Sequence, residues 1–417
     1  MGTGTLSKKA AGSKKAAVKA PSSKRTTPQN EATGPGWVSK YWGTAEQPTE
    51  FRAFVGPIIA LVLGLKLFVY MIGVTANELF SNTGFTSISA RFDIWNRWDA
   101  PHYLSVAQYG YQTSGDPANF VVFFPGYPWM VRLFAIPLGG NYLLAAFAVS
   151  TIASIAAALL LGYLVRGDSG DSELALRAVW FFLIFPTSYF LHLPYTESLF
   201  MACILGTFLA ARLDRWLLAG VVGALATLTR INGLVLLPAL AVEAYSQYRV
   251  SGRIRLQWLW ITLAGLGIAV YLFMNYHVYG RPFAFMTVQR EHWYKTLQWP
   301  WTGIHSKIEA GHGAKPSDKA ILVNQELLYI VIGAVATIAT WIWLRPSYAI
   351  WMTGNWLLFT STSYILSTPR YTLTLFPIFI LLAKVGKNRI VAMLVSFWSI
   401  LFLGLFTSLF AIGSWAY

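Results

Sequence analysis

The sequence predicts an all-α protein that crosses a membrane many times, and three observations support this prediction. Hydrophobic residues make up 55% of the 417 residues and charged residues 12%, whereas soluble domains carry about 25% charged residues. The mean hydropathy of the whole chain is +0.50. The apolar residues also fall into blocks of about 20, the length that a helix needs to cross a hydrocarbon core about 30 Å thick.

The apolar blocks predict about eleven membrane-spanning helices. In chain order, the predicted helices cover 54–75, 141–165, 174–192, 197–211, 215–229, 231–247, 258–279, 325–344, 348–366, 371–384 and 390–413. The stretch 122–138 is also apolar, but Pro125, Pro128 and Pro137 interrupt it. We therefore predict that this stretch is helical and lies in the membrane interface, within the first outer loop, without crossing the bilayer.

Much of the net charge of +15 lies near the N-terminus, where residues 1–30 hold seven Lys and Arg and no acid. The segment 1–50 has too few apolar residues to bury a core. We therefore expect a disordered basic tail there and one transmembrane domain over 51–417. Such a tail favours a cytoplasmic N-terminus over nucleic-acid binding, so no nucleic acid is expected as a partner.

The charges of the connecting segments predict which segments share a membrane face. With the N-terminus inside, the short inner turns carry Arg or Lys, as the positive-inside rule requires. The loops 76–140 and 280–324 and the turns 194–197 and 367–371 then fall together on the outer face. Loop 280–324 departs from the rule, with six Lys and Arg against three acids. A positive surface there suits an anionic substrate such as a lipid phosphate.

The most unusual outer segment is Asp93-Ile-Trp-Asn-Arg97-Trp98-Asp99-Ala-Pro-His102-Tyr, directly after the first predicted span. Ionisable groups against a bilayer are costly, so their concentration indicates a functional site. Structural explanations exist as well. Asp99 precedes Ala-Pro and is a candidate N-cap. Asp93 and Arg97, four residues apart, are candidates for an ion pair on a helix surface. His102 falls on the same helical face as Asp99, where a plain interfacial hydrogen bond would explain it equally well.

Further motifs follow in order along the chain. They are Tyr109-Gly110-Tyr111, Phe123-Phe124-Pro125-Gly126-Tyr127-Pro128, Tyr195-Thr196-Glu197-Ser198-Leu199-Phe200, Ala226-Thr227-Leu228-Thr229-Arg230-Ile231-Asn232-Gly233 and Pro369-Arg370-Tyr371. Together with the segment around Asp99, this series resembles the PIG-V family of glycosylphosphatidylinositol mannosyltransferases over most of residues 90–385.

The resemblance implies a GT-C fold, that is, a multi-helix membrane glycosyltransferase with its active site in the first outer loop. It also implies a polyprenyl-phosphate-linked sugar, mannose, as the donor and a lipid or glycan as the acceptor. The chain resembles the bacterial members more closely than the eukaryotic ones. We therefore expect it in the bacterial cytoplasmic membrane with its site outside, and the endoplasmic reticulum membrane is the alternative.

Sugar transfer from a polyprenyl phosphate needs a base for the acceptor hydroxyl and cations for the departing phosphate. We predict Asp99 as the base, with Asp93 as the alternative. Arg or Lys can stabilise a lipid monophosphate without a metal, so no metal or other cofactor is expected. Transfer in a single displacement would invert the anomeric centre. The candidates for phosphate contact are Arg230, Arg281 and Arg370.

The remaining candidates for substrate binding are Arg97, Trp98, His102, Tyr127, Glu197 and Tyr371. Glu197 is explained equally as an acid in the first turn of a helix, and Arg230 as a cation that snorkels to the interface. Two other classes of function stay open. A flippase or transporter of lipid-linked sugars would place its charges in mid-span, and a non-catalytic subunit of a glycosyltransferase complex would not need Asp99.

Overall fold

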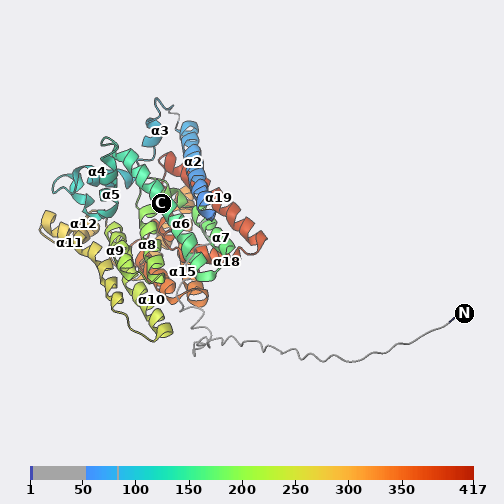
Figure 1. The fold of residues 1–417 in the computed structure, drawn as a ribbon. Coiled ribbons are helices and arrows are strands. Elements are labelled where there is room, and N and C mark those ends of the chain that lie inside the picture. The colour runs from blue at the N-terminus through green and yellow to red at the C-terminus, as the bar shows by residue number, and fades with distance from the viewer. Residues whose placement is uncertain (3–52, 82–83) are drawn as a thin grey trace.

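The computed structural model describes residues 1–2, 53–81 and 84–417, and Figure 1 shows its chain trace. The predicted tail, 1–50, lies outside these described residues except for its first two. Its disorder, and the division of the chain at residue 51, stay predictions.

The described residues are mostly helical, as predicted, and contain no strand; one isolated bridge joins Leu297 and Thr362. The α-helices are α2 Val55–Phe80, α3 Ala90–Asp93, α4 Ala100–Tyr109, α5 Gly126–Ala135, α6 Tyr142–Ser169, α7 Ser172–Leu183, α8 Glu197–Arg212, α9 Trp216–Thr229, α10 Leu236–Ser251, α11 Leu266–Tyr279, α12 Ala284–Glu291, α13 Pro300–Ala310, α14 Pro316–Asp318, α15 Glu326–Trp343, α16 Pro346–Thr360, α17 Thr368–Thr372, α18 Pro377–Val385 and α19 Arg389–Ala411. Short 3₁₀ helices cover η2 Asp116–Val122, η3 Ser188–Leu191, η4 Ile231–Val235 and η5 Leu256–Gly265, and a π-helix covers η6 Lys319–Gln325.

Among the described residues, five helical stretches are long and apolar enough to cross a membrane, so the predicted count of about eleven spans is not confirmed. They are Val55–Phe80, Tyr142–Ser169, Leu256–Tyr279, Pro316–Trp343 and Arg389–Ala411. Most other predicted spans are helical in the structure but shorter than 18 residues.

Prolines explain the clearest departures from the predicted helices. The predicted helix 174–192 ends at Leu183, before Pro186, and the predicted helix 371–384 is divided into α17 and α18 at Pro377. Proline inside a helix removes a backbone hydrogen bond and clashes with the preceding turn. In the stretch 122–138 the helix α5 begins only after Pro125, which agrees with a short helix that does not span the bilayer.

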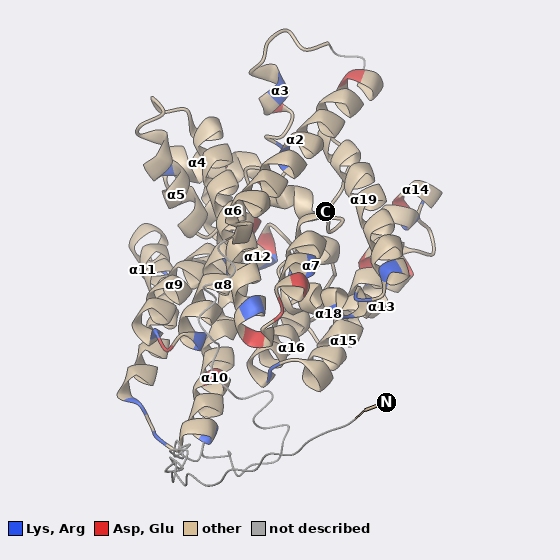
Figure 2. Ribbon diagram, turned by 45° about the vertical axis from the view of Figure 1, so that its right-hand side comes forward, with Lys and Arg blue, Asp and Glu red and all other residues tan. Residues whose placement is uncertain are grey.

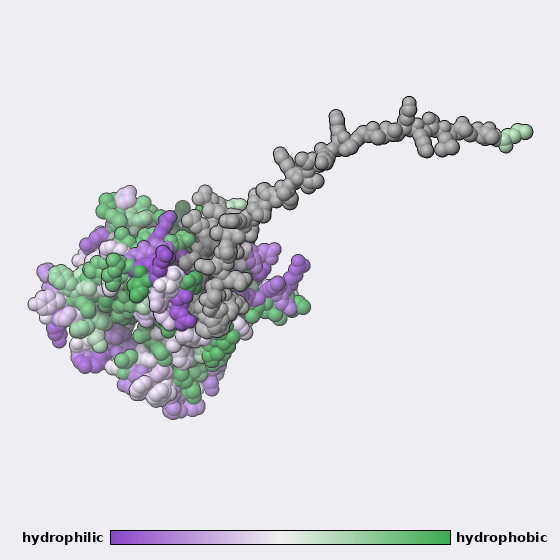
Figure 3. Space-filling view, turned by 60° about the horizontal axis from the view of Figure 1, so that its bottom comes forward, coloured by the Kyte–Doolittle hydropathy of each residue, from purple (hydrophilic) through white to green (hydrophobic). Residues whose placement is uncertain are grey.

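The surface of the outer helices is apolar in a regular pattern. Exposed side chains recur every four residues on α2, at Leu63, Leu67 and Met71. They recur in the same way on α19, at Met393, Phe397 and Leu401. Such stripes face away from the core and suit contact with lipid. Figure 3 shows hydrophobic residues over much of the visible surface, and Figure 2 shows charged residues as isolated segments between long uncharged ones.

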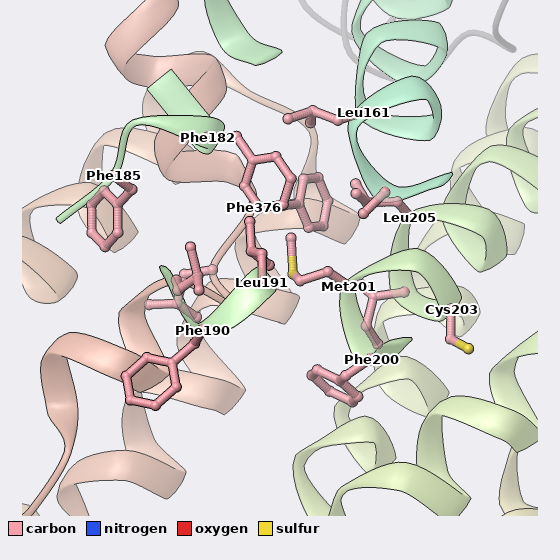
Figure 4. Packing of buried hydrophobic residues seen from close by; sticks show 14 of the residues in the cluster. Leu161, Phe182, Phe185, Phe190, Leu191, Phe200, Met201, Cys203, Leu205 and Phe376 are labelled. Atoms are coloured by element: carbon pink, nitrogen blue, oxygen red, sulfur yellow. The ribbon is translucent and has the colours of Figure 1, made fainter. Parts of the chain in front are cut away.

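The main core is a large, densely packed cluster around α6, α7, α8 and α18. Phe124, Leu228 and Tyr271 form a second, smaller cluster. Figure 4 shows Phe182 and Phe376 beside Leu191 and Met201, and all four side chains are buried. Close helix packing extends from this core towards α9 and α11. A Cβ at Gly267 would lie 2.1 Å from the backbone oxygen of Ala224, so glycine is what lets α11 approach α9 so closely.

A buried ionic cluster joins four helices at the C-terminal end of α8. The Arg212 guanidinium lies 2.9 Å from the Asp168 carboxylate of α6 and 2.8 Å from the Glu243 carboxylate of α10. Arg345, at the start of α16, lies 3.2 Å from Asp168. Glu197 lies at the other end of α8. At 1.5 Å per residue, the two ends of this helix are about 22 Å apart.

Candidate active site

A second buried ionic cluster lies at the N-terminal end of α8 and joins residues that are distant in sequence. The Arg370 guanidinium donates through Nη1 to Asp99 Oδ2 at 2.6 Å and through Nε to Glu197 Oε1 at 2.6 Å. Arg230 Nη1 donates to the same Glu197 oxygen at 2.5 Å. Two arginines and two carboxylates thus form one connected chain of ion pairs, Asp99–Arg370–Glu197–Arg230, which we call the ion-pair chain.

Arg370 is held from all sides. Its side chain is only 6% exposed, and its guanidinium carbon lies 4.7 Å from the ring centres of both Phe190 and Tyr195. Rings at this distance attract a cation through their π faces. The planar guanidinium, sandwiched between aromatic rings and two carboxylates, has one geometry available to it.

The short helix α17, which carries Arg370, is fixed by a carboxylate from another helix. Glu326, at the start of α15 and fully buried, accepts the backbone N–H of Ser367 at 2.6 Å and that of Thr368 at 2.7 Å. Ser367 has a left-handed backbone (φ 68°), which is uncommon for a residue with a side chain. Glu326 therefore satisfies the first N–H groups of α17 and sets the position of Arg370.

Arg230 lies where α9 ends and η4 begins, and its side chain is 15% exposed. Besides Glu197, it donates to the Thr196 hydroxyl at 2.8 Å, and it lies over the ring of Tyr371 at 5.4 Å. Snorkelling alone does not explain these contacts, because the guanidinium points into a network of specific partners.

Asp99 is the member of the ion-pair chain with the most exposed side chain, at 31%. It stands at the N-cap position of α4, but its side chain makes no capping hydrogen bond. Its Oδ2 is bonded to Arg370, and its Oδ1 has no hydrogen-bond partner within the described part of the chain. The preceding Trp98 has a left-handed backbone (φ 57°), a costly conformation for a bulky residue that is typical of functional sites.

Asp99 lines a cavity of about 430 Å³. Its walls come from six separate stretches of the chain, and they include residues of three of the predicted outer segments. The polar and charged lining residues are Asp99, Thr229, Arg230, Asn232, Gln289, Lys295, Thr296, Ser361, Thr362 and Arg370, and the aromatic ones are Tyr103, Phe123, Phe124, Phe285, Trp293, Phe359 and Tyr371. A pocket that combines aromatic walls with polar groups is typical of a binding site for a small molecule.

His102 is enclosed by aromatic rings beside this cavity. Its ring stacks on Phe123 at 4.9 Å and meets Phe120 edge-on at 4.5 Å and Trp293 at 6.1 Å. Burial lowers the pKa of His102 below its usual value, although the nearby Asp99 carboxylate opposes this shift. The shift favours the neutral imidazole, and the ring packs as part of the aromatic wall.

The structure places the other predicted residues of the first outer loop away from the ion-pair chain. Asp93 is exposed in α3, and no ion pair joins it to Arg97, so that predicted contact is wrong. Arg97 donates instead to the backbone oxygen of Ile94 at 2.8 Å. The Trp98 ring packs edge-on against Trp415 at 5.1 Å. None of the three predicted residues lines the cavity.

Four further predicted residues also lie outside the cavity lining, namely His102, Tyr127, Glu197 and Arg281. Tyr127 is fully buried, and its hydroxyl bonds to the Ser150 hydroxyl at 3.1 Å, which packs α5 against α6. Arg281 is exposed after the end of α11.

Lys295 and Gln289 line the cavity but were not among the predicted site residues. Both belong to loop 280–324. The surplus of Lys and Arg in this loop was the sequence signal for Lys295, and no sequence signal pointed to Gln289. The sequence offered no means of choosing among the six cations of this loop.

Comparison with known proteins identifies the family. Residues 66–297 match the family model described as Mannosyltransferase (PIG-V). The GPI alpha-1,6-mannosyltransferase 2 of Cricetulus griseus is 33% identical over 149 residues, which are 34% of this chain and 29% of that protein. The match thus spans less than a third of that relative's length.

Solved structures of the Archaeoglobus fulgidus oligosaccharyltransferase are more distant. The complex with Zn and sulfate has a TM-score of 0.43 at 13% identity, covering 84% of this chain and 53% of the other. The AglB complex with an inhibitory peptide and a dolichol-phosphate has a TM-score of 0.44 at 12% identity, covering 85% and 56%. The chain spans just over half the length of these proteins. The family match alone covers more than half of the present chain, and it is the basis for the assignment: this chain belongs to the mannosyltransferase (PIG-V) family.

Proposed function

We propose that the protein is a GT-C-type membrane mannosyltransferase that transfers mannose from a polyprenyl-phosphate donor to a lipid or glycan acceptor. The observation that carries the proposal is the position of Asp99: it lines the cavity with one free carboxylate oxygen, while its other oxygen is held by Arg370. Family membership supplies the class of reaction, and the cavity supplies a place for it.

The chemistry follows from these contacts as a single displacement. Oδ1 of Asp99 accepts the proton of the acceptor hydroxyl as its oxygen attacks the anomeric carbon of the donor sugar. The bond between that carbon and the phosphate oxygen breaks, and its electron pair leaves with the lipid phosphate. Attack from the face opposite the phosphate inverts the anomeric centre. Asp99 ends the step protonated and returns its proton to solvent.

The ion-pair chain prepares Asp99 for this step. Arg370 bonds to one oxygen of Asp99 and thereby fixes the direction in which the other oxygen points. Glu197 balances the charges of Arg370 and Arg230, so the site holds both arginines without a large surplus of positive charge. Preorganised groups of this kind cost no reorganisation when charge develops in the transition state.

Metal independence is part of the proposal. The described residues contain no group of three or more His, Cys, Asp or Glu side chains placed to hold a metal ion. In this proposal, Arg and Lys side chains of the chain stabilise the departing phosphate. Activity should therefore survive treatment with a chelator, and a loss that added Mg²⁺ or Mn²⁺ restores would contradict this part of the proposal.

We further propose that the site faces the outer side of a bacterial cytoplasmic membrane, with the endoplasmic reticulum membrane as the alternative. The cavity draws its walls from predicted outer segments around Asp99, Lys295 and Arg370, which supports a common side for them. A transporter would need charged groups along a path through the bilayer. The ion-pair chain instead lies at helix ends, which favours an enzyme.

The test is transfer of labelled mannose from polyprenyl-phosphate mannose by the purified protein, with membrane lipids from a deletion strain as the acceptor source. Asp99→Asn should lower turnover by at least about 100-fold, because a positioned base contributes about that much. Asp93→Asn, the exposed neighbour, is the matched control and should retain activity. Full activity of a folded Asp99→Asn protein would refute the proposed base, and loss in Asp93→Asn alone would transfer the role to that residue.

A further inference from the structure

Three cations line the cavity, and they differ in how their charge is balanced. Arg370 and Arg230 both belong to the ion-pair chain, where Asp99 and Glu197 are their partners. Lys295 is half-buried in the same cavity, and no carboxylate of the described residues lies within ion-pair distance of it. Its ammonium lies over the rings of Tyr364 and Tyr371, at 5.7 and 5.8 Å.

Hydrogen bonds fix the backbone around Lys295 to the segment around Ser363. Its own N–H donates to the backbone oxygen of Gln289 at 3.0 Å. On either side, the Tyr364 hydroxyl donates to the Trp293 oxygen at 2.7 Å, and the Ser363 N–H donates to the Thr296 oxygen at 2.9 Å. Lys295 is therefore presented by a braced turn, which limits the freedom that an exposed lysine would have.

Of the three cations that line the cavity, Lys295 is the one whose charge is not offset by a carboxylate of the described residues, so it can bind an anion. Asp99 and Glu197 offset the two arginines, and the charge of Lys295 remains. A sugar phosphodiester carries one negative charge, and the monoester that leaves carries about −1.5 to −2 at pH 7. As the bond to the sugar breaks, the negative charge on the phosphate grows, and its attraction to a nearby cation becomes stronger. This stronger attraction stabilises the transition state relative to the bound donor.

The cavity residues near Lys295 that are most exposed are aliphatic. Leu297 is 80% exposed, Ile231 is 42% exposed and Leu358 is 39% exposed, and all three line the cavity. Exposed apolar side chains at the entrance of a cavity are favourable where they contact a hydrocarbon chain. A site for a water-soluble sugar donor would not need such residues at its entrance.

We infer that Lys295 binds the phosphate of the polyprenyl-phosphate donor, and that the prenyl chain leaves the cavity past Ile231, Leu297 and Leu358. The inference rests on the proposed function, because it names the residues that hold the donor of that reaction. In this arrangement Lys295 makes the main contact with the phosphate. Arg370 mainly holds Asp99 in position and makes a smaller contribution to phosphate binding.

The experiment measures binding without requiring turnover. The full-length protein in nanodiscs is titrated with a short-chain prenyl phosphate and with the corresponding prenol, and then with dioleoyl phosphatidylglycerol as a second phosphate lipid. Lys295→Gln should weaken binding of the prenyl phosphate roughly 10- to 100-fold, the value of a hydrogen bond to a charged group. Binding of the prenol should not change, and Lys295→Arg should restore part of the affinity. Lys315→Gln is the matched control, because Lys315 is exposed in the same loop and does not line the cavity.

The possible results distinguish failure of the inference from failure of the proposed function. Equal prenyl phosphate affinities of Lys295→Gln and Lys315→Gln would overturn the inference, while loss of transfer in Asp99→Asn would still support the proposed function. A loss confined to phosphatidylglycerol would place Lys295 on the acceptor side and would also overturn it. If the wild-type protein bound prenol as tightly as prenyl phosphate, the inference and the proposed lipid-phosphate donor would both fall.

Discussion

Glu197 offers the sharpest test of the ion-pair chain. Its side chain is fully buried, and its Oε1 accepts hydrogen bonds from both Arg230 and Arg370. Replacement by glutamine keeps the shape and the acceptor oxygen but removes the charge. Since Oε2 of Glu197 has no partner among the described residues, the new amide nitrogen breaks no existing hydrogen bond.

The expected loss of stability follows from these two bonds. A hydrogen bond to a charged group contributes about 1.5–3 kcal/mol, and the two arginine donors stay ionised when the acceptor becomes a neutral amide, so both bonds are weakened but not lost. We expect the free energy of unfolding of Glu197→Gln to fall by about 1.5–3 kcal/mol, which is less than loss of the whole partner would cost. Glu197→Ala removes the partner altogether, and breaking a buried ion pair in this way costs about 3–5 kcal/mol.

Activity should fall for a separate reason. Without the charge of Glu197, Arg370 is left with Asp99 as its carboxylate partner and draws that carboxylate towards itself. The free Asp99 oxygen then loses its direction, and misplacement of a reacting group by about 1 Å can cost about 100-fold in rate. We expect kcat of Glu197→Gln to fall at least tenfold.

Glu243→Gln is the matched control. Glu243 is equally buried and bonds to Arg212 at 2.8 Å and to the Ser347 hydroxyl at 2.8 Å, in the cluster at the other end of α8. Its replacement should destabilise the protein to a similar degree but leave the rate per folded molecule near wild type. Unfolding in detergent and mannose transfer, measured on the same preparations, separate the two effects. Equal activity of the two variants, or wild-type stability of Glu197→Gln, would refute the reasoning.

Three further predictions follow from the same geometry. Glu326→Gln should lower kcat by up to roughly 100-fold, because one acceptor oxygen cannot hold both N–H groups of α17 and Arg370 shifts; an unchanged kcat would show that α17 is held by other contacts. Because burial lowers the pKa of His102 despite Asp99 and Asp116, the unfolded chain binds the proton more readily, and the free energy of unfolding should fall as pH drops below about 6.5. His102→Phe should flatten this dependence in denaturation curves measured between pH 7 and 5, and an equally steep curve would assign the effect to other groups. Finally, an impermeant thiol reagent should label Ala118→Cys from outside intact cells but not Ser251→Cys, and the buried native Cys203 should give little background; outside labelling of Ser251→Cys would reverse the proposed orientation.

The sequence by itself determined the features that depend on neighbouring residues. Apolar runs such as 55–80 and 389–411 give membrane-length helices because helix formation and bilayer length are local properties. The motifs around Asp99, Glu197, Arg230 and Arg370 were recognisable from residue types and order alone, and the structure brings all four into one ion-pair chain.

Only the tertiary structure decided which of the candidate residues meet. Asp99 and Arg370 are 271 positions apart, and their contact depends on how α4, α8 and α17 pack. The same packing leaves Asp93, Arg97 and Tyr127 outside the cavity.

Lys295 is the clearest example of a site residue that the sequence could not identify. Nothing in its immediate sequence separates it from the other cations of loop 280–324. It reaches the cavity because the turn that carries it is hydrogen-bonded to the segment around Ser363, 68 positions further along the chain (363 − 295). Local sequence sets which residues are helical and which carry charge. The partners of each buried charge come from contacts between distant segments, since a buried ion is tolerated only where the packing supplies a counterion or hydrogen-bond donors.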